Sequence, residues 1–275
     1  MDREQLLRAA VAAAREAGDL LLDRLGRVTG IEKKGAVDLV TEADTASERL
    51  LVLRLAAALP GASILAEEGQ GFTADANRRW IVDPLDGTTN FAHGYPVFCV
   101  SLALEVDGVL VLGVIFDPTR NECFTALRGE GAFLDGKPIQ VSATAELGDA
   151  LVVTGFPYDV RTSERDNLAA FGYFLKRARA VRRDGSAALD LAYVACGRFD
   201  GFWEEKLAPW DMAAGALLVM EAGGEVSGYL GGPVDLHAGN LVASNRRIHA
   251  ALCRGLGVAS LKGLGGKDEE IGGRE

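Results

Sequence analysis

The sequence of 275 residues predicts a mixed α/β (α+β) protein made of two subdomains that join near residues 143–150. Before the junction, apolar runs over 97–106, 109–117 and 121–127 alternate with turn signals such as Asp107-Gly108, which is typical of an antiparallel sheet. After it, short apolar runs alternate with helical periodicity, which is typical of α/β folds. We therefore assign 1–146 to an N-terminal subdomain and 147–260 to a C-terminal subdomain, and predict a disordered tail over 261–275.

The N-terminal subdomain is predicted to begin with two amphipathic helices, each ended by residues that do not continue a helix. Apolar residues recur at helical spacing over 4–25 before Gly26, and again over 44–59 before Pro60-Gly61. Short strands are expected near 31–33 and 37–41, between the two helices. An apolar run over 63–66 then ends directly at Glu67, and Asp135-Gly136 indicates a further hairpin.

The C-terminal subdomain is predicted to contain four helices and two short strands. The helix near its middle ends at Gly223-Gly224. The strands are expected over 152–154 and 199–203, and the helices over 164–178, 186–196, 210–222 and 246–254.

Composition and charge narrow the class of protein. A net charge of −10 and a pI near 4.9 argue against bulk binding of nucleic acid, which needs a basic surface. Four scattered cysteines without a C-x-x-C pair, and no apolar run near the roughly 18 residues of a membrane span, predict a reduced cytoplasmic protein without a membrane segment. An acidic protein still accepts an anionic substrate where bound metal ions reverse the local charge.

The stretch 80–91 carries the strongest functional signal. Asp83 and Asp86 stand three residues apart around a proline, where an apolar run ends. Carboxylates this close repel one another unless a cation lies between them, and their oxygens suit Mg²⁺. The glycine and hydroxyl residues that follow, Gly87 and Thr88, offer backbone N–H groups to a phosphate. A metal beside a phosphate predicts phosphoryl chemistry.

Other candidate residues each have a structural alternative. Asp211 lies in the first turn of a predicted helix, where a carboxylate also stabilises the helix dipole, and Glu67 alone is equally a solvated loop residue. Both nevertheless border apolar runs at element ends, where α/β folds gather their sites. The segment 131–138 matches most of a P-loop, but Pro138 replaces the required hydroxyl residue and the segment sits on a hairpin, so we reject it. The three histidines lack ligand spacing, which argues against zinc.

The motifs together resemble the inositol monophosphatase family of magnesium-dependent, lithium-sensitive phosphatases, over about residues 5–255. They are Val37-Asp38-Leu39-Val40-Thr41-Glu42-Ala43-Asp44, Ala66-Glu67-Glu68-Gly69, Asp83-Pro84-Leu85-Asp86-Gly87-Thr88-Thr89-Asn90-Phe91, Gly185-Ser186-Ala187-Ala188-Leu189-Asp190 and Trp210-Asp211-Met212-Ala213-Ala214-Gly215. The resemblance implies a layered α-β-α-β-α sandwich of two subdomains, of the sugar-phosphatase type, and a homodimer.

The resemblance also implies a role for each site residue. Asp44 and Thr88 would orient the attacking water as the catalytic pair. The metal ligands would be Glu67, Asp83, the Leu85 carbonyl, Asp86 and Asp211, with Thr88 bordering the first ion. The substrate would meet Asp86, Gly87, Thr88, Gly185, Ser186, Ala187, Glu204 and Asp211.

We therefore predict a phosphomonoesterase that uses two or three Mg²⁺ ions and an activated water to hydrolyse inositol 1-phosphate and related small polyol or sugar phosphates. A phosphatase of the same fold for histidinol phosphate, fructose 1,6-bisphosphate or a 3′-phosphonucleotide is the alternative among enzymes. Glu205 and Lys206, next to Glu204, either influence which alcohol is accepted or point to solvent. A partner-binding protein with a structural cation site is the alternative outside enzymes.

Overall fold

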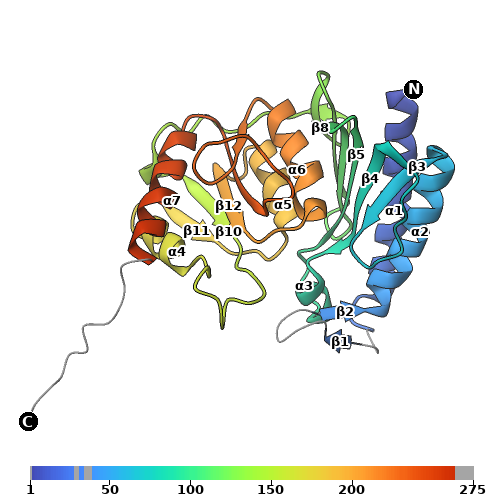
Figure 1. The fold of residues 1–275 in the computed structure, drawn as a ribbon, viewed down its shortest axis with the longest axis horizontal. Coiled ribbons are helices and arrows are strands. Elements are labelled where there is room, and N and C mark those ends of the chain that lie inside the picture. Colours follow the sequence, from blue (N-terminus) through green and yellow to red (C-terminus); the bar gives the residue numbers. More distant parts are fainter. Residues whose placement is uncertain (1, 28–30, 34–38, 264–275) are drawn as a thin grey trace, which may run out of the picture.

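Two large β-sheets and three pairs of helices stack as five layers in the computed structural model, which describes residues 2–27, 31–33 and 39–263 (Figure 1). A separate two-stranded sheet pairs β1 (Ile31–Lys33) with β2 (Leu39–Thr41). One helix pair covers the outer face of each sheet, and the third pair lies between the sheets. From the N-terminal side, the pairs are α1 (Arg3–Arg24) and α2 (Glu42–Ala58), α5 (Ala187–Ala195) and α6 (Pro209–Glu221), and α4 (Leu168–Leu175) and α7 (His249–Gly263). The predicted α-β-α-β-α sandwich is confirmed.

The first sheet has seven strands in the order β3-β4-β5-β6-β7-β8-β9, and only the β3–β4 pair is parallel. The antiparallel run predicted from the sequence is confirmed. At its first turn, Asp107 and Gly108 have φ angles of 51° and 75°, which suit a tight hairpin. The strands are β3 (Ala62–Ala66), β4 (Asp75–Asp86), β5 (Cys99–Val106), β6 (Val109–Asp117), β7 (Glu122–Leu127), β8 (Gly131–Leu134) and β9 (Lys137–Pro138).

The second sheet has five strands in the order β11-β10-β12-β14-β13 and mixes parallel with antiparallel pairs. Alternate residues of β12 face opposite layers, because side chains alternate along a strand. Phe202 packs toward α5 and α6, whereas Trp203 packs toward α4 and α7. The strands are β10 (Leu151–Thr154), β11 (Ala180–Arg182), β12 (Gly201–Glu205), β13 (Glu225–Ser227) and β14 (Asn240–Ser244).

Two helices of the second half differ from the prediction. The helix predicted over 164–178 is shorter, because Asn167 has a left-handed φ of 65° and its side chain is held by Gly155 O (2.6 Å) and the Trp203 indole N–H (2.8 Å). The helix predicted over 246–254 is longer and ends at Gly263, so the first three residues of the predicted tail are helical. Residues 264–275 lie outside the described residues, as do 37 and 38 of the predicted strand 37–41, of which β2 (Leu39–Thr41) is the described part.

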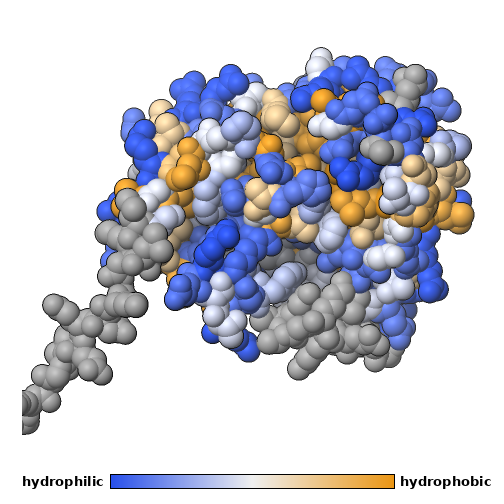
Figure 2. All heavy atoms as spheres, viewed as in Figure 1, coloured by the Kyte–Doolittle hydropathy of each residue, from blue (hydrophilic) through white to orange (hydrophobic). Residues whose placement is uncertain are grey.

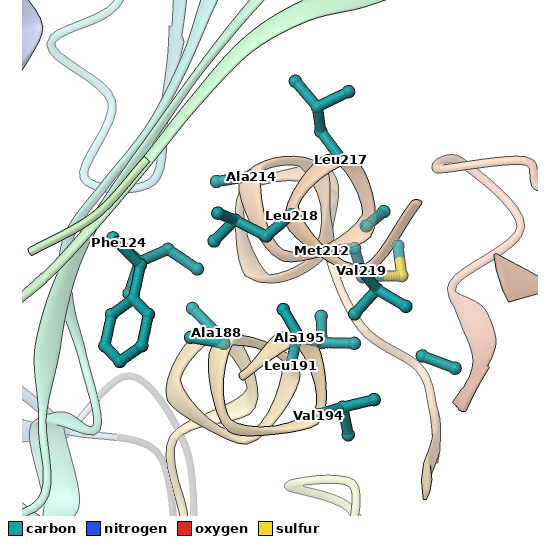
Figure 3. Packing of buried hydrophobic residues seen from close by; sticks show 14 of the residues in the cluster. Phe124, Ala188, Leu191, Val194, Ala195, Met212, Ala214, Leu217, Leu218 and Val219 are labelled. Carbon is teal, nitrogen blue, oxygen red and sulfur yellow. The ribbon is translucent and has the colours of Figure 1, made fainter. Parts of the chain in front are cut away.

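The layer between the sheets is packed through small and aliphatic side chains. Figure 3 shows α5 and α6 side by side, with Phe124 of the seven-stranded sheet reaching toward them. Gly113 of β6 permits the close approach of α6, since a Cβ atom there would lie 3.0 Å from Ala214 O. This packing fixes the first turns of α5 and α6 near the end of β4, where the acidic motif lies.

The surface carries no continuous apolar band in the view of Figure 2, where hydrophilic side chains dominate and apolar ones form separate patches. None of the helices in the described part of the chain has the length and apolar character that crossing a membrane requires. All four cysteines are free thiols, and Cys99 and Cys123 are buried.

Candidate active site

The end of β4 departs from a regular strand at the acidic motif. Its pairing with β5 is irregular between Asp83 and Asp86, where Pro84 has no N–H to donate to the ladder. The Asp83 carboxylate accepts a hydrogen bond from Leu85 N (3.0 Å), and the Ser47 hydroxyl of α2 donates to Pro84 O (2.8 Å). At this irregularity, a β-bulge, the side chains of Asp83 and Asp86 no longer follow the regular alternation of a strand.

Asp83 is the electrostatic centre of the motif. Its side chain is buried, and burial together with the negative charges of Glu67, Asp86 and Asp211 holds its pKa well above the usual value. The structure therefore brings the charges of the other three predicted acidic ligands to act on this one carboxylate. A set of carboxylate oxygens that repel one another is the donor chemistry that suits a hard divalent cation.

The acidic side chains are not arranged as a ready metal cluster. Within the described ranges, no group of three or more His, Cys, Asp or Glu side chains is placed so that it could hold a metal ion. Two of the carboxylates are turned toward protein donors instead. Asp86 accepts from Ser186 Oγ and Ala188 N (both 2.7 Å), and Asp211 accepts from Ala208 N (2.7 Å). The metal roles of these residues remain a prediction.

Asp44 and Thr88 are in direct contact, although 44 residues separate them. Thr88, in the short helix α3 (Thr88–Ala92), places its hydroxyl 2.9 Å from Asp44 Oδ1 and 3.1 Å from Leu85 O. The other Asp44 oxygen accepts from Thr41 N (2.8 Å) and Thr41 Oγ1 (2.6 Å), which closes a capping box at the start of α2. Burial raises the pKa of Asp44, and these donors oppose the rise. The pair predicted to orient water is thus rigidly held.

Gly87 allows the chain to turn sharply into α3. Its φ of 101° is left-handed, and a Cβ atom at this position would lie 2.9 Å from Val97 O. The first N–H groups of a helix have no partner within the helix. Gly87, Thr88 and Thr89 line a cavity of about 90 Å³, into which a phosphate would fit against this turn.

The same cavity is completed from the other half of the chain. Gly185, Ser186, Ala187, Glu204 and Asp211 line it together with Asp86. Asn90 of α3 ties the halves, because its amide donates to Asp184 O (2.8 Å) and Val97 O (2.7 Å). The structure thus brings every predicted substrate residue to one cavity.

Glu204 is a buried acid on the wall of this cavity. Burial, with a smaller effect from the negative charge of Asp86, raises its pKa to about 8, while the positive charge of Arg183 opposes the rise. A Cβ atom at Gly155 would collide with the Glu204 carboxyl group, so the glycine makes room for it. The side chain is therefore held in place and largely protonated at neutral pH when no cation is nearby.

We expect Glu204→Gln to flatten the pH dependence of stability. The pKa of Glu204 is raised in the folded state, so its protonation favours folding at low pH, and that contribution is lost as pH rises from 4.5 through about 8. In EDTA, the wild type should lose on the order of a few kcal/mol more than the variant between pH 5 and pH 8. Urea denaturation at both pH values measures this, and equal losses would contradict the raised pKa.

Glu205 and Lys206 do not simply point to solvent. Glu205 forms an ion pair with Arg165 (3.0 Å), and its side chain is 11% exposed. Lys206 pairs with Asp159 (2.7 Å) and also donates to Ser163 Oγ (2.6 Å). Both residues line the cavity, so of the two sequence interpretations the influence on the accepted alcohol fits better.

Several residues of the site were not predicted. Ala188 contacts Asp86 only through its backbone N–H, and the amide of Asn90 donates to the backbone carbonyl of Asp184 in a distant loop. The type of side chain at 188 or 90 therefore does not predict either contact. Asp190 lines the cavity as a buried acid. Its place in the run 185–190 was visible in the sequence, but its burial was not.

Comparison with known proteins agrees with this architecture. The family model of the inositol monophosphatase family matches residues 2–258. The inositol-1-monophosphatase of Synechocystis sp. is 46% identical over 257 residues, which cover 93% of this chain and 90% of that protein. The Nus factor SuhB of Pseudomonas aeruginosa is 46% identical over 256 residues, which cover 90% and 94%. The inositol monophosphatase structure from Anabaena sp. has a TM-score of 0.86 at 42% identity, covering 94% of this chain and 97% of that one.

Fold and comparisons together define a phosphoric monoester hydrolase with a metal-dependent chemistry. More specifically, the chain belongs to the inositol monophosphatase family. The resemblance seen in the motifs is thereby confirmed.

Proposed function

We propose that this protein hydrolyses inositol 1-phosphate and related small polyol or sugar phosphates with the help of Mg²⁺. The observation that carries the proposal is the convergence of the charges of Glu67, Asp86 and Asp211 on the buried carboxylate Asp83, beside a cavity lined by the Gly87 turn. The names of the similar proteins support the choice of inositol 1-phosphate.

The acidic residues would hold the cations. Glu67, Asp83, the Leu85 carbonyl, Asp86 and Asp211 are the proposed ligands of two or three Mg²⁺ ions. When bound, the ions make water a stronger nucleophile and neutralise charge on the phosphoryl group. The raised pKa of Asp83 is consistent with this role, because a bound cation would offset both the burial and the repulsion that raise it.

Thr88 and Asp44 would handle the proton of the attacking water. In this proposal the Thr88 hydroxyl accepts a hydrogen bond from water and donates its own proton toward Asp44 Oδ1, which lies 2.9 Å away. The Asp44 carboxyl is fixed by its bonds to Thr41, so it orients Thr88 without a change of rotamer.

Different parts of the cavity would bind the phosphate and the alcohol of the substrate. The backbone N–H groups of Gly87 and Thr88 would bind the phosphate, as a helix start favours anions. Glu204, with the loop of Gly185, Ser186 and Ala187, would face the leaving alcohol. Hydrolysis would proceed by direct attack of water, without a phosphorylated residue of the chain.

Phosphate release from a panel of esters tests this proposal. We expect turnover of inositol 1-phosphate to require Mg²⁺, to stop in EDTA and to be inhibited by lithium. A preference for histidinol phosphate of more than about tenfold would replace the proposed substrate, while the assignment as a phosphatase would stand. No hydrolysis of any ester with Mg²⁺ would overturn the proposal itself.

A partner-binding role is the second candidate, because a 46% identical relative is named Nus factor SuhB. In that case the acidic cluster would be a structural cation site, and Asp83→Asn would leave partner binding intact. A homodimer and a cytoplasmic location remain predictions, which sedimentation and cell fractionation would check.

A further inference from the structure

Asp190 is an acid whose burial the preceding roles leave unexplained. It lies on α5, is 1% exposed, and its Oδ1 atom is buried without a hydrogen-bond partner among the described residues. Leaving such an oxygen unpartnered is unfavourable, so buried carboxyl groups are nearly always paired. An unpaired one therefore requires a reason in the function of the protein.

The position of Asp190 supplies that reason. Asp190 lines the same cavity as Arg183 and as Glu204, the residue that faces the leaving alcohol in the proposed function. Burial holds the pKa of Asp190 well above its usual value, the negative charges of Asp184, Glu204 and Asp86 raise it further, and Arg183 opposes the rise. The wall thus combines two acceptors of hydrogen bonds, Asp190 and Glu204, with a guanidinium donor.

We propose that Asp190 determines specificity for the leaving alcohol by accepting a hydrogen bond from one of its hydroxyl groups. The inference rests on the proposed phosphatase function and adds to it a residue that selects a neutral polyol as the leaving alcohol. A hydroxyl group both donates and accepts, so it matches a wall that has carboxyl groups and a guanidinium group. An ammonium group only donates, and Arg183 would repel it.

The role of Asp190 differs from that of the acids at the end of β4. Asp190 would contact the alcohol in the bound substrate and in the transition state alike. Its loss should therefore raise KM and leave kcat nearly unchanged. Since the unpaired carboxyl group is unfavourable for folding, its removal should also raise the melting temperature.

The experiment compares three esters with wild type, Asp190→Ala, Asp190→Asn and Asp184→Asn, each with Mg²⁺. The esters are inositol 1-phosphate, phenyl phosphate, whose leaving group has no further hydroxyl, and phosphoethanolamine, which carries an ammonium group. Asp184→Asn is the matched control, because Asp184 influences Asp190 by charge while it is not among the described residues that line the cavity.

For Asp190→Ala, we expect KM for inositol 1-phosphate to rise about tenfold or more and kcat/KM for phenyl phosphate to stay within about twofold. Asp190→Asn keeps an acceptor oxygen and should recover much of the loss. Asp184→Asn should leave the ratio between the two esters unchanged. A higher melting temperature of Asp190→Ala, measured on the same samples, would show that the loss is not a folding defect.

Four results would overturn the inference. Equal losses for inositol 1-phosphate and phenyl phosphate would make Asp190 a structural residue. A wild-type preference for phosphoethanolamine that disappears in Asp190→Ala would make the site a cation site. An unchanged KM for both esters in Asp190→Ala would remove its role in specificity while leaving the proposed phosphatase intact, whereas a wild type that hydrolyses none of the esters would remove both.

Discussion

Asp83→Asn is expected to reduce phosphate release by at least about 10³-fold and, in the absence of Mg²⁺, to raise the melting temperature. The loss of activity follows if Asp83 is shared between cations, since an amide lacks the charge that holds them. The gain in stability follows from the structure, because burial and three neighbouring acids make an ionised Asp83 unfavourable. A residue that only supports the fold would not combine a loss of activity with a gain in stability.

Thermal unfolding with and without Mg²⁺, beside a phosphate assay, measures both effects. Mg²⁺ should raise the melting temperature of the wild type and have much less effect on the variant. Asp75→Asn is the matched control at the other end of β4, where a hydrogen bond from the Asn77 N–H and an ion pair with Arg78 (2.7 Å) lower the pKa of the acid. That variant should keep its activity and gain no stability. Normal turnover by Asp83→Asn would contradict the proposal that Asp83 is a metal ligand.

Thr88→Ala is expected to lower kcat by about 10²- to 10⁴-fold, the usual range for loss of general acid–base assistance. The structure gives the reason, because the Thr88 hydroxyl is the atom that connects Asp44 Oδ1 with the β4 bulge. Thr88→Ser keeps the hydroxyl and should retain most of the activity. KM should change less than kcat, since the Thr88 hydroxyl would assist the attacking water only in the chemical step.

Ser47→Ala provides the comparison for Thr88→Ala. Ser47 is also buried and also donates to a carbonyl of the β4 bulge, that of Pro84, but among the described residues its hydroxyl forms no hydrogen bond with an acid of the site. A modest loss of stability with nearly normal kcat is expected for it. If both alanine variants lost activity equally, the integrity of the bulge rather than the Thr88 hydroxyl would explain the effect.

The local motifs could be predicted from the sequence, whereas contacts that depend on distant segments could not. The turn at Asp83, Asp86 and Gly87 could be predicted, because proline, glycine and paired acids rarely occur together at a strand end for another reason. The contact between Asp44 and Thr88 came only from the family resemblance. Nothing in the sequence around 164–178 showed that Trp203 would hold Asn167 outside the helix. The strands β11, β13 and β14 were missed because they are short: β11 and β13 have three residues each, and the apolar run of β14 is only Leu241, Val242 and Ala243.

The amide of Asn90 has a consequence for how the protein is made. It reaches from α3 to the carbonyl of Asp184, and Asp86 relies on donors at residues 186 and 188. A nascent chain that has emerged only as far as β9 therefore carries its phosphate turn and acidic strand end without the groups that complete them. In the proposed function the site is complete only after α6, which carries Asp211, has left the ribosome, so an unfinished polypeptide would be inert toward its substrate.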